Sequence, residues 1–306
     1  MPDSKANSKV GLIVTAAPDS HPAPPGHPER YERLGPTIDY LTEGEGAALV
    51  QPLKLRSYDI DLIKRIHDPA YVDQLAAIAA QGGGDLDAET HLTASSFDAS
   101  CELTWALLTA VEDAFAIGPK RSFVIGRPPG HHAEYDRGMG FCLVNHVAVA
   151  AQFAFDRGLA RRVAIVDCDV HHGKGTQHAF YERSDVFFVS SHQYPYYPGT
   201  GAAQDVGRGE GEGTTLNLPM SGGTGNDELL VAYDRAWEAL VAYDPDLVLV
   251  SAGFDAHRQD PLAALELTSD CYGDLARHLV SLADSCCDGR VVATMEGGYN
   301  PQANRE

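Results

Sequence analysis

A run of apolar residues ends abruptly in groups that bind cations and move protons. In "VAIVDCDVHHGKG" (163–175), the apolar start leads into Asp167, Asp169, His171 and His172. Side chains alternate across a strand, so Asp167, Asp169 and His171 share one face. A carboxylate and an imidazole two residues apart can ligate one cation. The spacing therefore predicts part of a metal site at the end of a buried strand.

A third ligand must come from a neighbouring strand, and Asp255 in "SAGFDAH" (251–257) is the candidate. An unpaired carboxylate after a buried strand would be costly. Two carboxylates and one imidazole leave an open coordination position, which is the mark of a catalytic zinc. Taken alone, each residue is better explained by a buried ion pair or a hydrogen-bond network. The combination of the D-x-D-x-H run with Asp255 favours a metal.

Two further motifs suggest proton transfer. In "RPPGHHAE" (127–134), His131 and His132 follow two prolines and a glycine on a stiff loop. Imidazole titrates near neutral pH, so the pair is a candidate general base with an electrostatic partner. In "EGGYN" (296–300), the Tyr299 phenol could donate to a developing oxyanion. A core tyrosine near the C-terminus explains Tyr299 equally well.

Other motifs that carry chemistry are incomplete. The D-x-D-x-H run matches the start of an EF-hand loop, but His172 stands where that loop needs glycine and His178 where it needs glutamate. "GKGT" (173–176) lacks the spacing of a phosphate-binding loop. "GRGEGEG" (207–213) precedes a strand-like "TTLNLP" rather than the helix of a dinucleotide site. The absence of a GxSxG motif weakens a serine-hydrolase interpretation.

The elements that position these groups alternate along the chain. Helical spacing predicts helices over 143–158 and 226–243, with Asn226 and Asp227 as the cap of the second. Alternating strands and helices indicate an α/β fold with a mostly parallel sheet covered on both faces. Short β-branched runs predict strands at 9–15, 121–127, 161–167, 185–191, 246–253 and 290–296.

Five of these strands are followed by polar clusters: "RPPGHH", "DCDVHHG", "SSHQ", "SAGFDAH" and "EGGYN". Ligands in α/β sheets bind beyond the carboxyl ends of the strands, so the clusters are expected to form one site. No linker or internal repeat is evident, and we expect one domain over 1–306.

Composition narrows the class of protein. The chain has 306 residues, of which 44% are hydrophobic and 22% charged, as in a globular protein with a sizeable core. The net charge of −20 argues against nucleic acid, whose phosphates need clustered Lys and Arg. This negative charge is compatible with a cationic substrate, and equally with a role only in keeping the protein soluble. Six cysteines without CxxC spacing indicate free thiols. With no apolar run long enough to cross a bilayer, we expect no membrane association and a cytoplasmic location.

The motifs together resemble the histone deacetylase and acetylpolyamine amidohydrolase superfamily, which shares its fold with arginase. The resemblance is closest to class II and bacterial deacetylase-like amidohydrolases, and it covers nearly the whole chain. It rests on "HPERYERL" (27–34), "HDPAYVDQL" (67–75), "RPPGHHAEYDRGMGFCLVNHVAVAA" (127–151), "VDCDVHHGKGTQ" (166–177), "SSHQYPYYPGTG" (190–201), "SAGFDAHRQDPLAALELT" (251–268) and "EGGYN".

The resemblance implies a single-domain, three-layer arginase/deacetylase-like fold with a mostly parallel eight-stranded sheet flanked by helices. It also implies roles for residues that match the family's motifs. Asp169, His171 and Asp255 match zinc ligands; His132 matches the general base, His131 its charge-stabilising companion and Tyr299 the carbonyl-polarising tyrosine; Asp167 and Ser190 match a structural potassium site; Gly140, Phe141, Tyr197, Leu262 and Gly298 match substrate-binding positions.

Three of the matched positions depart from the family pattern. Lys174 stands where the family usually has Asp or Asn beside the second histidine, and an ammonium cannot accept the His132 N–H. A nearby cation would also disfavour protonated His132. Tyr197 replaces the usual tunnel phenylalanine, which favours a more polar ligand. Leu262 stands where a polyamine-specific relative has glutamate, which counts against that polyamine mode.

The sequence also ends seven residues after Tyr299, whereas relatives continue into further helix. We therefore expect either a trimmed C-terminus or a missing last helix.

The expected activity is zinc-dependent hydrolysis of an acetyl or short acyl amide on a lysine side chain in proteins or peptides. One alternative is an amidohydrolase of small N-acyl amines such as acetylpolyamines. Another is a weakly catalytic acyl-lysine binding or regulatory protein, which the Lys174 departure keeps open. An arginase-like binuclear manganese enzyme would need more bridging carboxylates. The substrate, the acyl length and the oligomeric state are left open by the sequence.

Overall fold

The computed structural model describes residues 9–306, so residues 1–8 of the expected domain lie outside the described part of the chain. Within it, eight strands form one sheet in the order β2-β1-β5-β10-β9-β6-β7-β8, and all their pairings are parallel. The strands are β1 (Val10–Val14), β2 (Val50–Pro52), β5 (Arg121–Ile125), β6 (Val163–Asp167), β7 (Val186–Gln193), β8 (Thr215–Met220), β9 (Leu247–Ala252) and β10 (Val291–Met295).

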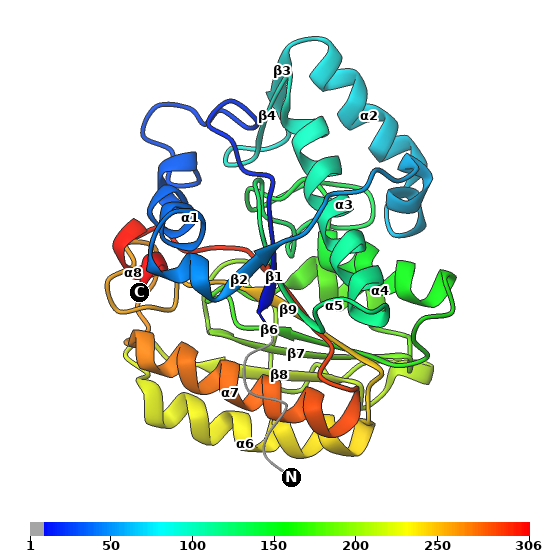
Figure 1. Cartoon of the computed structure of the whole chain (residues 1–306), viewed down its shortest axis with the longest axis vertical. Helices are drawn as coiled ribbons and strands as arrows, with labels where there is room; N and C mark the ends of the chain where they lie inside the picture. The colour runs from blue at the N-terminus through cyan, green and yellow to red at the C-terminus, as the bar shows by residue number, and fades with distance from the viewer. Residues whose placement is uncertain (1–8) are drawn as a thin grey trace.

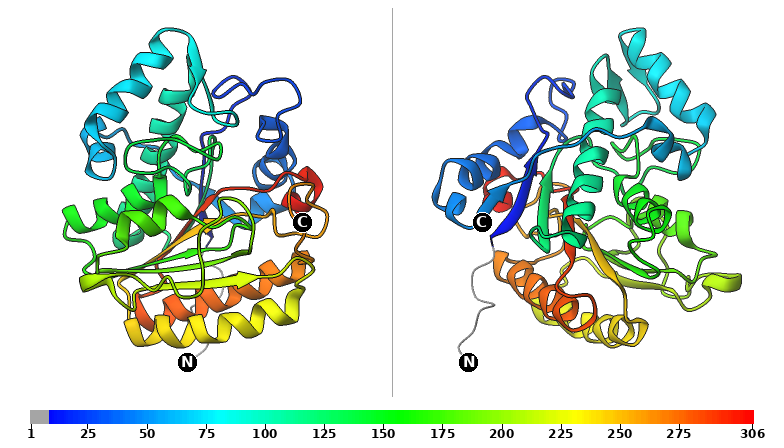
Figure 2. Two further views of the ribbon diagram at one scale, coloured as in Figure 1. Left: turned by 180° about the vertical axis from the view of Figure 1, so that it is seen from behind. Right: turned by 45° about the vertical axis from the view of Figure 1, so that its right-hand side comes forward.

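Helices cover both faces of the sheet (Figure 1). The α6 and α7 pair lies together on one face, and Figure 2 shows this pair from behind with the sheet between it and α2, α3 and α4. The helices are α1 (Gly35–Thr42), α2 (Pro69–Ala80), α3 (Ser96–Phe115), α4 (His146–Asp156), α5 (Lys174–Phe180), α6 (Asn226–Tyr243), α7 (Ser269–Cys286) and α8 (Pro301–Arg305); a separate antiparallel pair consists of β3 (Gly83–Asp85) and β4 (His91–Thr93).

The alternation of side chains along β6 explains the three layers. Val163 and Ile165 pack into the core shared with α2, α3 and α4. Ala164 and Val166 pack into the core shared with α6 and α7. A strand buried on both faces must be apolar throughout, which is why its sequence reads as a continuous apolar run. The expected α/β fold with helices on both faces of a parallel sheet is therefore confirmed.

Each of the six β-branched runs coincides with a strand, although β7 continues beyond its run to Gln193, and "TTLNLP" overlaps β8, which ends at Met220. The edge strand β2, only three residues long, is not among the predicted strands. The helix predicted over 143–158 is shorter, because Asn145 caps α4 by accepting a hydrogen bond from the main-chain N–H of Ala148.

The predicted cap of α6 is wrong by one position. Gly225 is the N-cap residue, and its N–H donates to the Glu228 carboxylate at 3.2 Å. The amide of Asn226 instead donates to the Thr268 hydroxyl across the fold. At the other end of the chain, the short helix α8 follows Tyr299. Within residues 9–306, none of the helices combines the length and apolar character that crossing a bilayer requires.

Candidate active site

The three predicted metal ligands meet beyond the carboxyl ends of β6 and β9. His171 lies between two carboxylates, with its Nδ1 3.2 Å from Asp169 Oδ1 and 3.2 Å from Asp255 Oδ2. One ligand atom from each residue lies within 4.8 Å of the others. Both aspartates are almost fully buried. Burial would lower the pKa of His171, but its carboxylate neighbours raise it to about 10. The group is therefore built to share one cation.

Main-chain donors hold both aspartates in place. The N–H of Val170 donates to Asp255 Oδ1 at 2.9 Å, and the N–H of Gly297 donates to Asp169 Oδ2 at 2.8 Å. Within residues 9–306, Asp255 Oδ2 is buried without a well-aligned hydrogen-bond donor. A side chain at Gly297 would collide with Asp169 and Asp255, so this close approach of the chain beyond β10 to the group requires glycine. The unpartnered oxygen, two carboxylates and an imidazole suit a bound zinc ion.

The two adjacent histidines have different environments. His131 Nδ1 lies 3.0 Å from Asp167 Oδ2, and its Nε2 lies 3.8 Å from Asp169 Oδ1. Burial opposes protonation of His131, but these carboxylates raise its pKa well above the usual value. His132 is equally buried, and its Nδ1 has no hydrogen-bond partner in the described part of the chain. Burial, with the neighbouring His131, lowers the pKa of His132 well below the usual value.

Lys174, the residue that departs from the family pattern, is paired with a carboxylate. Its ammonium lies 3.0 Å from Glu134 Oε1, and His178 Nδ1 lies 2.8 Å from the other Glu134 oxygen. His132 Nδ1 has no partner in the described part of the chain, and the effect of Lys174 on the orientation of His132 stays a prediction. Sequence reasoning missed Glu134, although it belongs to the same "RPPGHHAE" motif.

A pocket of about 360 Å³ opens above this group. Tyr299 lines it, with its ring 6.0 Å from that of Phe141 and its main-chain N–H donating to Asp260 at 2.7 Å. Burial raises the pKa of Tyr299 well above its usual value, so its hydroxyl stays protonated and able to donate. The pocket is lined by His27, Pro28, Ala88, Glu89, Pro129, His131, His132, Gly140, Phe141, His171, Tyr196, Tyr197, Leu262, Gly297 and Tyr299.

Four of the five predicted substrate-binding positions line this pocket: Gly140, Phe141, Tyr197 and Leu262. A side chain at Gly140 would collide with the His132 ring, and its φ of 57° also favours glycine. Gly298 is not among the lining residues; its carbonyl accepts hydrogen bonds from Asn304 at 2.9 Å and Arg33 at 3.3 Å. Its neighbour Gly297 lines the pocket instead.

The two predicted potassium ligands lie opposite each other on β6 and β7. Asp167 and Ser190 are register partners, and both are fully buried. His192 Nε2 donates to the Gly201 carbonyl at 2.8 Å, so its Nδ1 accepts from the Ser190 hydroxyl at 3.0 Å. The lone pairs of Ser190 Oγ are thus available to a cation. His172 lies away from the metal group and bonds to the Thr200 and Gln177 side chains.

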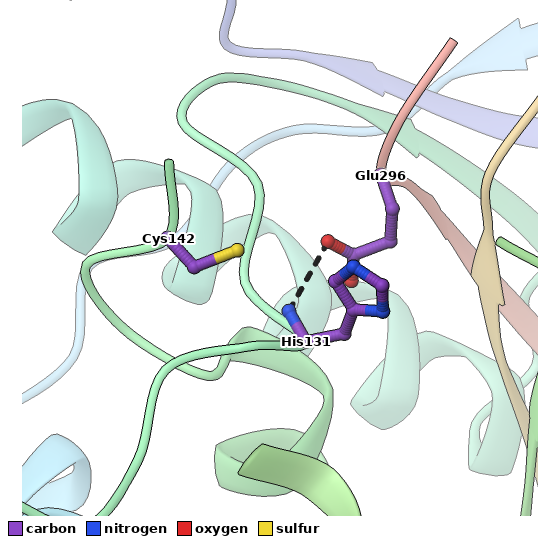
Figure 3. A group of neighbouring side chains, drawn as sticks. All are labelled: His131, Cys142 and Glu296. Atoms are coloured by element: carbon purple, nitrogen blue, oxygen red, sulfur yellow. Dashed lines mark hydrogen bonds between the residues drawn. The ribbon is translucent and has the colours of Figure 1, made fainter. Parts of the chain in front are cut away.

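Sequence reasoning also missed Tyr196, whose ring stacks on His171 at 5.7 Å and whose hydroxyl donates to the Leu262 carbonyl. It missed Glu296 as well, a buried carboxylate next to His131 and Cys142 (Figure 3). Tyr196 belongs to the motif "SSHQYPYYPGTG" and Glu296 to "EGGYN", but a tyrosine and a glutamate at these positions do not by themselves indicate these contacts.

Comparisons with known proteins agree with this geometry. The family model of the histone deacetylase domain matches residues 27–306. A probable deacetylase of Archaeoglobus fulgidus is 37% identical, covering 95% of this chain and 81% of that protein. A histone deacetylase-like amidohydrolase of Pseudomonas aeruginosa is also 37% identical, with 91% and 74% covered.

The crystal structure of the HDA15 HD domain superposes with a TM-score of 0.88 and 34% identity, covering 97% of this chain and 86% of that one. The shared architecture extends over the sheet and both helical layers, so the match is not limited to the site. The chain therefore belongs to the histone deacetylase family.

Proposed function

We propose that this protein is a zinc-dependent amidohydrolase that removes acetyl or short acyl groups from the amine of acyl-lysine side chains. The observation that carries the proposal is the arrangement of one pocket. His171, beside two buried aspartates, lines this pocket together with His132 and Tyr299. An acyl amide held there would meet a Lewis acid, a neutral base and a hydroxyl donor together.

Asp169, His171 and Asp255 would hold the zinc ion, and Asp167 with Ser190 would hold potassium. Carboxylate and imidazole ligands with an open position are typical of catalytic zinc, and hard oxygen ligands suit the second cation. Zinc bound at this group would lower the pKa of a water molecule and polarise the acyl carbonyl.

The chain's own residues would move the protons. His132 is neutral at physiological pH because its pKa is lowered, so it can take a proton from the attacking water. Tyr299 then donates a hydrogen bond from its hydroxyl to the oxyanion of the tetrahedral intermediate. Protonated His132 returns its proton to the amine nitrogen as the C–N bond breaks. His131, held protonated by Asp167, offsets the negative charge that develops.

The pocket walls suit a lysine side chain. Phe141 and Leu262 give the pocket an apolar lining, which matches the methylene chain of lysine, and Tyr197 adds an aromatic ring with a hydroxyl. Among the described residues that line it, Glu89 is the only Asp or Glu, and none is Lys or Arg. The ion pair of Lys174 with Glu134 supports the catalytic alternative over a non-catalytic binding protein, because it compensates the charge of Lys174.

Replacing Tyr299 with phenylalanine tests the proposal. The variant Tyr299→Phe should bind one zinc per chain but lose about 100- to 1000-fold in kcat on an acetyl-lysine peptide, because it lacks an oxyanion donor. Metal content and turnover would be measured together on acetyl-lysine peptides, free acetylpolyamines and longer acyl-lysines. Unchanged turnover in Tyr299→Phe, or full activity after chelation, would contradict the proposal.

A further inference from the structure

Glu296 is a buried carboxylate that the proposed reaction does not use. It follows β10 directly and is 1% exposed. Its Oε2 accepts the main-chain N–H of Gly130 at 2.7 Å and that of His131 at 3.3 Å, the second of which is drawn in Figure 3. Its Oε1 accepts the Ser251 hydroxyl of β9 at 3.1 Å. One side chain thus connects the histidine loop to two neighbouring strands.

Burying the Glu296 carboxylate is energetically unfavourable. Burial raises the pKa of Glu296, and no Lys or Arg within residues 9–306 forms an ion pair with it. A buried carboxylate is tolerated only when its oxygens are hydrogen-bonded. Two of its three donors are main-chain N–H groups of the histidine loop, and without an acceptor they would be buried and unsatisfied. Its contacts therefore serve the loop that carries His131.

The residues that follow Glu296 contact the rest of the site. The N–H of Gly297 donates to the predicted metal ligand Asp169, and the N–H of Tyr299 donates to Asp260. Within four residues, one strand end holds the histidine loop, a metal ligand and the pocket tyrosine. A shift of the His131 main chain relative to Asp169 is therefore opposed by Glu296.

We propose, on the basis of the function proposed above, that Glu296 is a positioning residue that fixes His131 relative to the metal ligands. It touches neither substrate nor metal. Its effect is geometric: the position of its oxygens, rather than its charge, sets where the His131 ring stands. A displacement of about 1 Å in a catalytic group can cost on the order of 100-fold in rate.

The same residue belongs to a group that a metal could use. Ligand atoms of His131, Cys142 and Glu296 lie within 4.8 Å of one another. Each residue is already hydrogen-bonded, however: Cys142 Sγ donates to the Gly140 carbonyl at 3.3 Å, and His131 Nδ1 donates to Asp167. The hydrogen bonds explain the group without a second metal, and the experiment below includes metal content for this reason.

A matched pair of variants separates position from charge. Glu296→Gln keeps an oxygen at the same distance and removes the charge. Glu296→Asp keeps the charge and withdraws the oxygens by one methylene. We expect Glu296→Asp to lower kcat per bound zinc by about 10- to 100-fold on an acetyl-lysine peptide, with KM within about twofold. Glu296→Gln should stay within about fivefold of the unaltered chain. Cys142→Ser, the control in the same group, should keep its activity.

The outcomes are distinct. If kcat per bound zinc falls at least as much in Glu296→Gln as in Glu296→Asp, the effect comes from the charge, and the inference is overturned. Full activity in both variants would overturn it as well. A second zinc equivalent that Glu296→Gln or Cys142→Ser removes would also overturn it. If Glu296→Asp does not fold, amide hydrogen exchange decides: the Gly130 and His131 N–H groups must be protected in the unaltered chain and in Glu296→Gln. An unaltered chain with no deacylase activity would refute the proposed function itself.

Discussion

His131 and His132 are neighbours in sequence, with ring centroids 4.0 Å apart, yet their surroundings have opposite effects on charge. His131 is hydrogen-bonded to the buried Asp167, and its pKa is raised. His132 has no acceptor for Nδ1 within residues 9–306, and its pKa is lowered. Both side chains are 3% exposed, so the difference does not come from burial. It comes from where the nearest carboxylate lies.

This comparison assigns the two roles. A histidine that is already protonated cannot act as a base, whereas a neutral one can accept a proton from water. The cation on His131 also disfavours a second cation on His132, because the two rings share one buried space. The pairing of Lys174 with Glu134 completes the difference, since no carboxylate of the described chain bonds to His132 Nδ1.

The largest effect is expected from removing the neutral member of the pair. His132→Ala should lower kcat by about 100- to 10,000-fold, because the general base is lost while the metal ligands stay intact. Turnover of an acetyl-lysine peptide per bound zinc measures this effect. Turnover within about threefold of the unaltered chain would show that His132 is not the base, and the assignment of roles would be reversed or abandoned.

A smaller effect is expected from giving His132 the acceptor that it lacks. Lys174→Asp introduces a carboxylate at the position where the family usually has Asp or Asn beside the second histidine, and we expect it to accept the Nδ1–H of His132 and stabilise the protonated ring. This raises the pKa of His132, and because the base must be unprotonated, the acid limb of the kcat/KM profile should move to higher pH by about one unit.

The matched control is Lys174→Met, which also frees Glu134 from its ion pair but supplies no acceptor. Its acid limb should lie below that of Lys174→Asp in pH. Identical pH profiles for the two variants would show that position 174 does not face His132. The missing acceptor would then not explain the lowered pKa of His132.

The smallest effect concerns stability. Burial would raise the pKa of Glu134, but hydrogen bonds with His178 and Lys174 lower it below 4.5. Glu134→Gln should therefore reduce the free energy of unfolding at pH 7 by about 1 kcal/mol.

A group whose folded pKa is lowered stabilises the protein above its unfolded pKa, and the contribution is lost as pH falls through the folded value. The difference between Glu134→Gln and the unaltered chain should therefore shrink as the pH falls below about 4.5 in denaturant titrations. A difference that persists undiminished at a pH of about 3 would show that the ion pair with Lys174 is not its source.

Much of the site could be predicted from residue types at strand ends. Asp169, His171 and Asp255 are expected to meet, and they do, because parallel strands deliver their carboxyl ends to one edge of the sheet. The contacts of Tyr196 and Glu296 could not be predicted in this way. Both residues stand inside quoted motifs, but their contacts join segments far apart in the chain.

Most differences between prediction and structure share one physical cause. The cap bond of Gly225 is local, with Glu228, but the bond of Asn226 to Thr268, that of Arg33 to the Gly298 carbonyl and the pairing of Lys174 with Glu134 depend on which groups come close after folding. A local pattern reports periodicity and residue type, but a hydrogen bond to a distant segment leaves no trace in that pattern.

Residue order alone was enough to predict the parallel sheet, the strand that ends in Asp167, and the residue types that suit zinc and proton transfer. Those features follow from side-chain alternation and from the cost of burying charge, which act on neighbouring residues. Which histidine carries the proton could be known only from the folded chain. That choice depends on Asp167 at the end of β6, which bonds to His131, and on the lack of such an acceptor for His132 Nδ1 within residues 9–306.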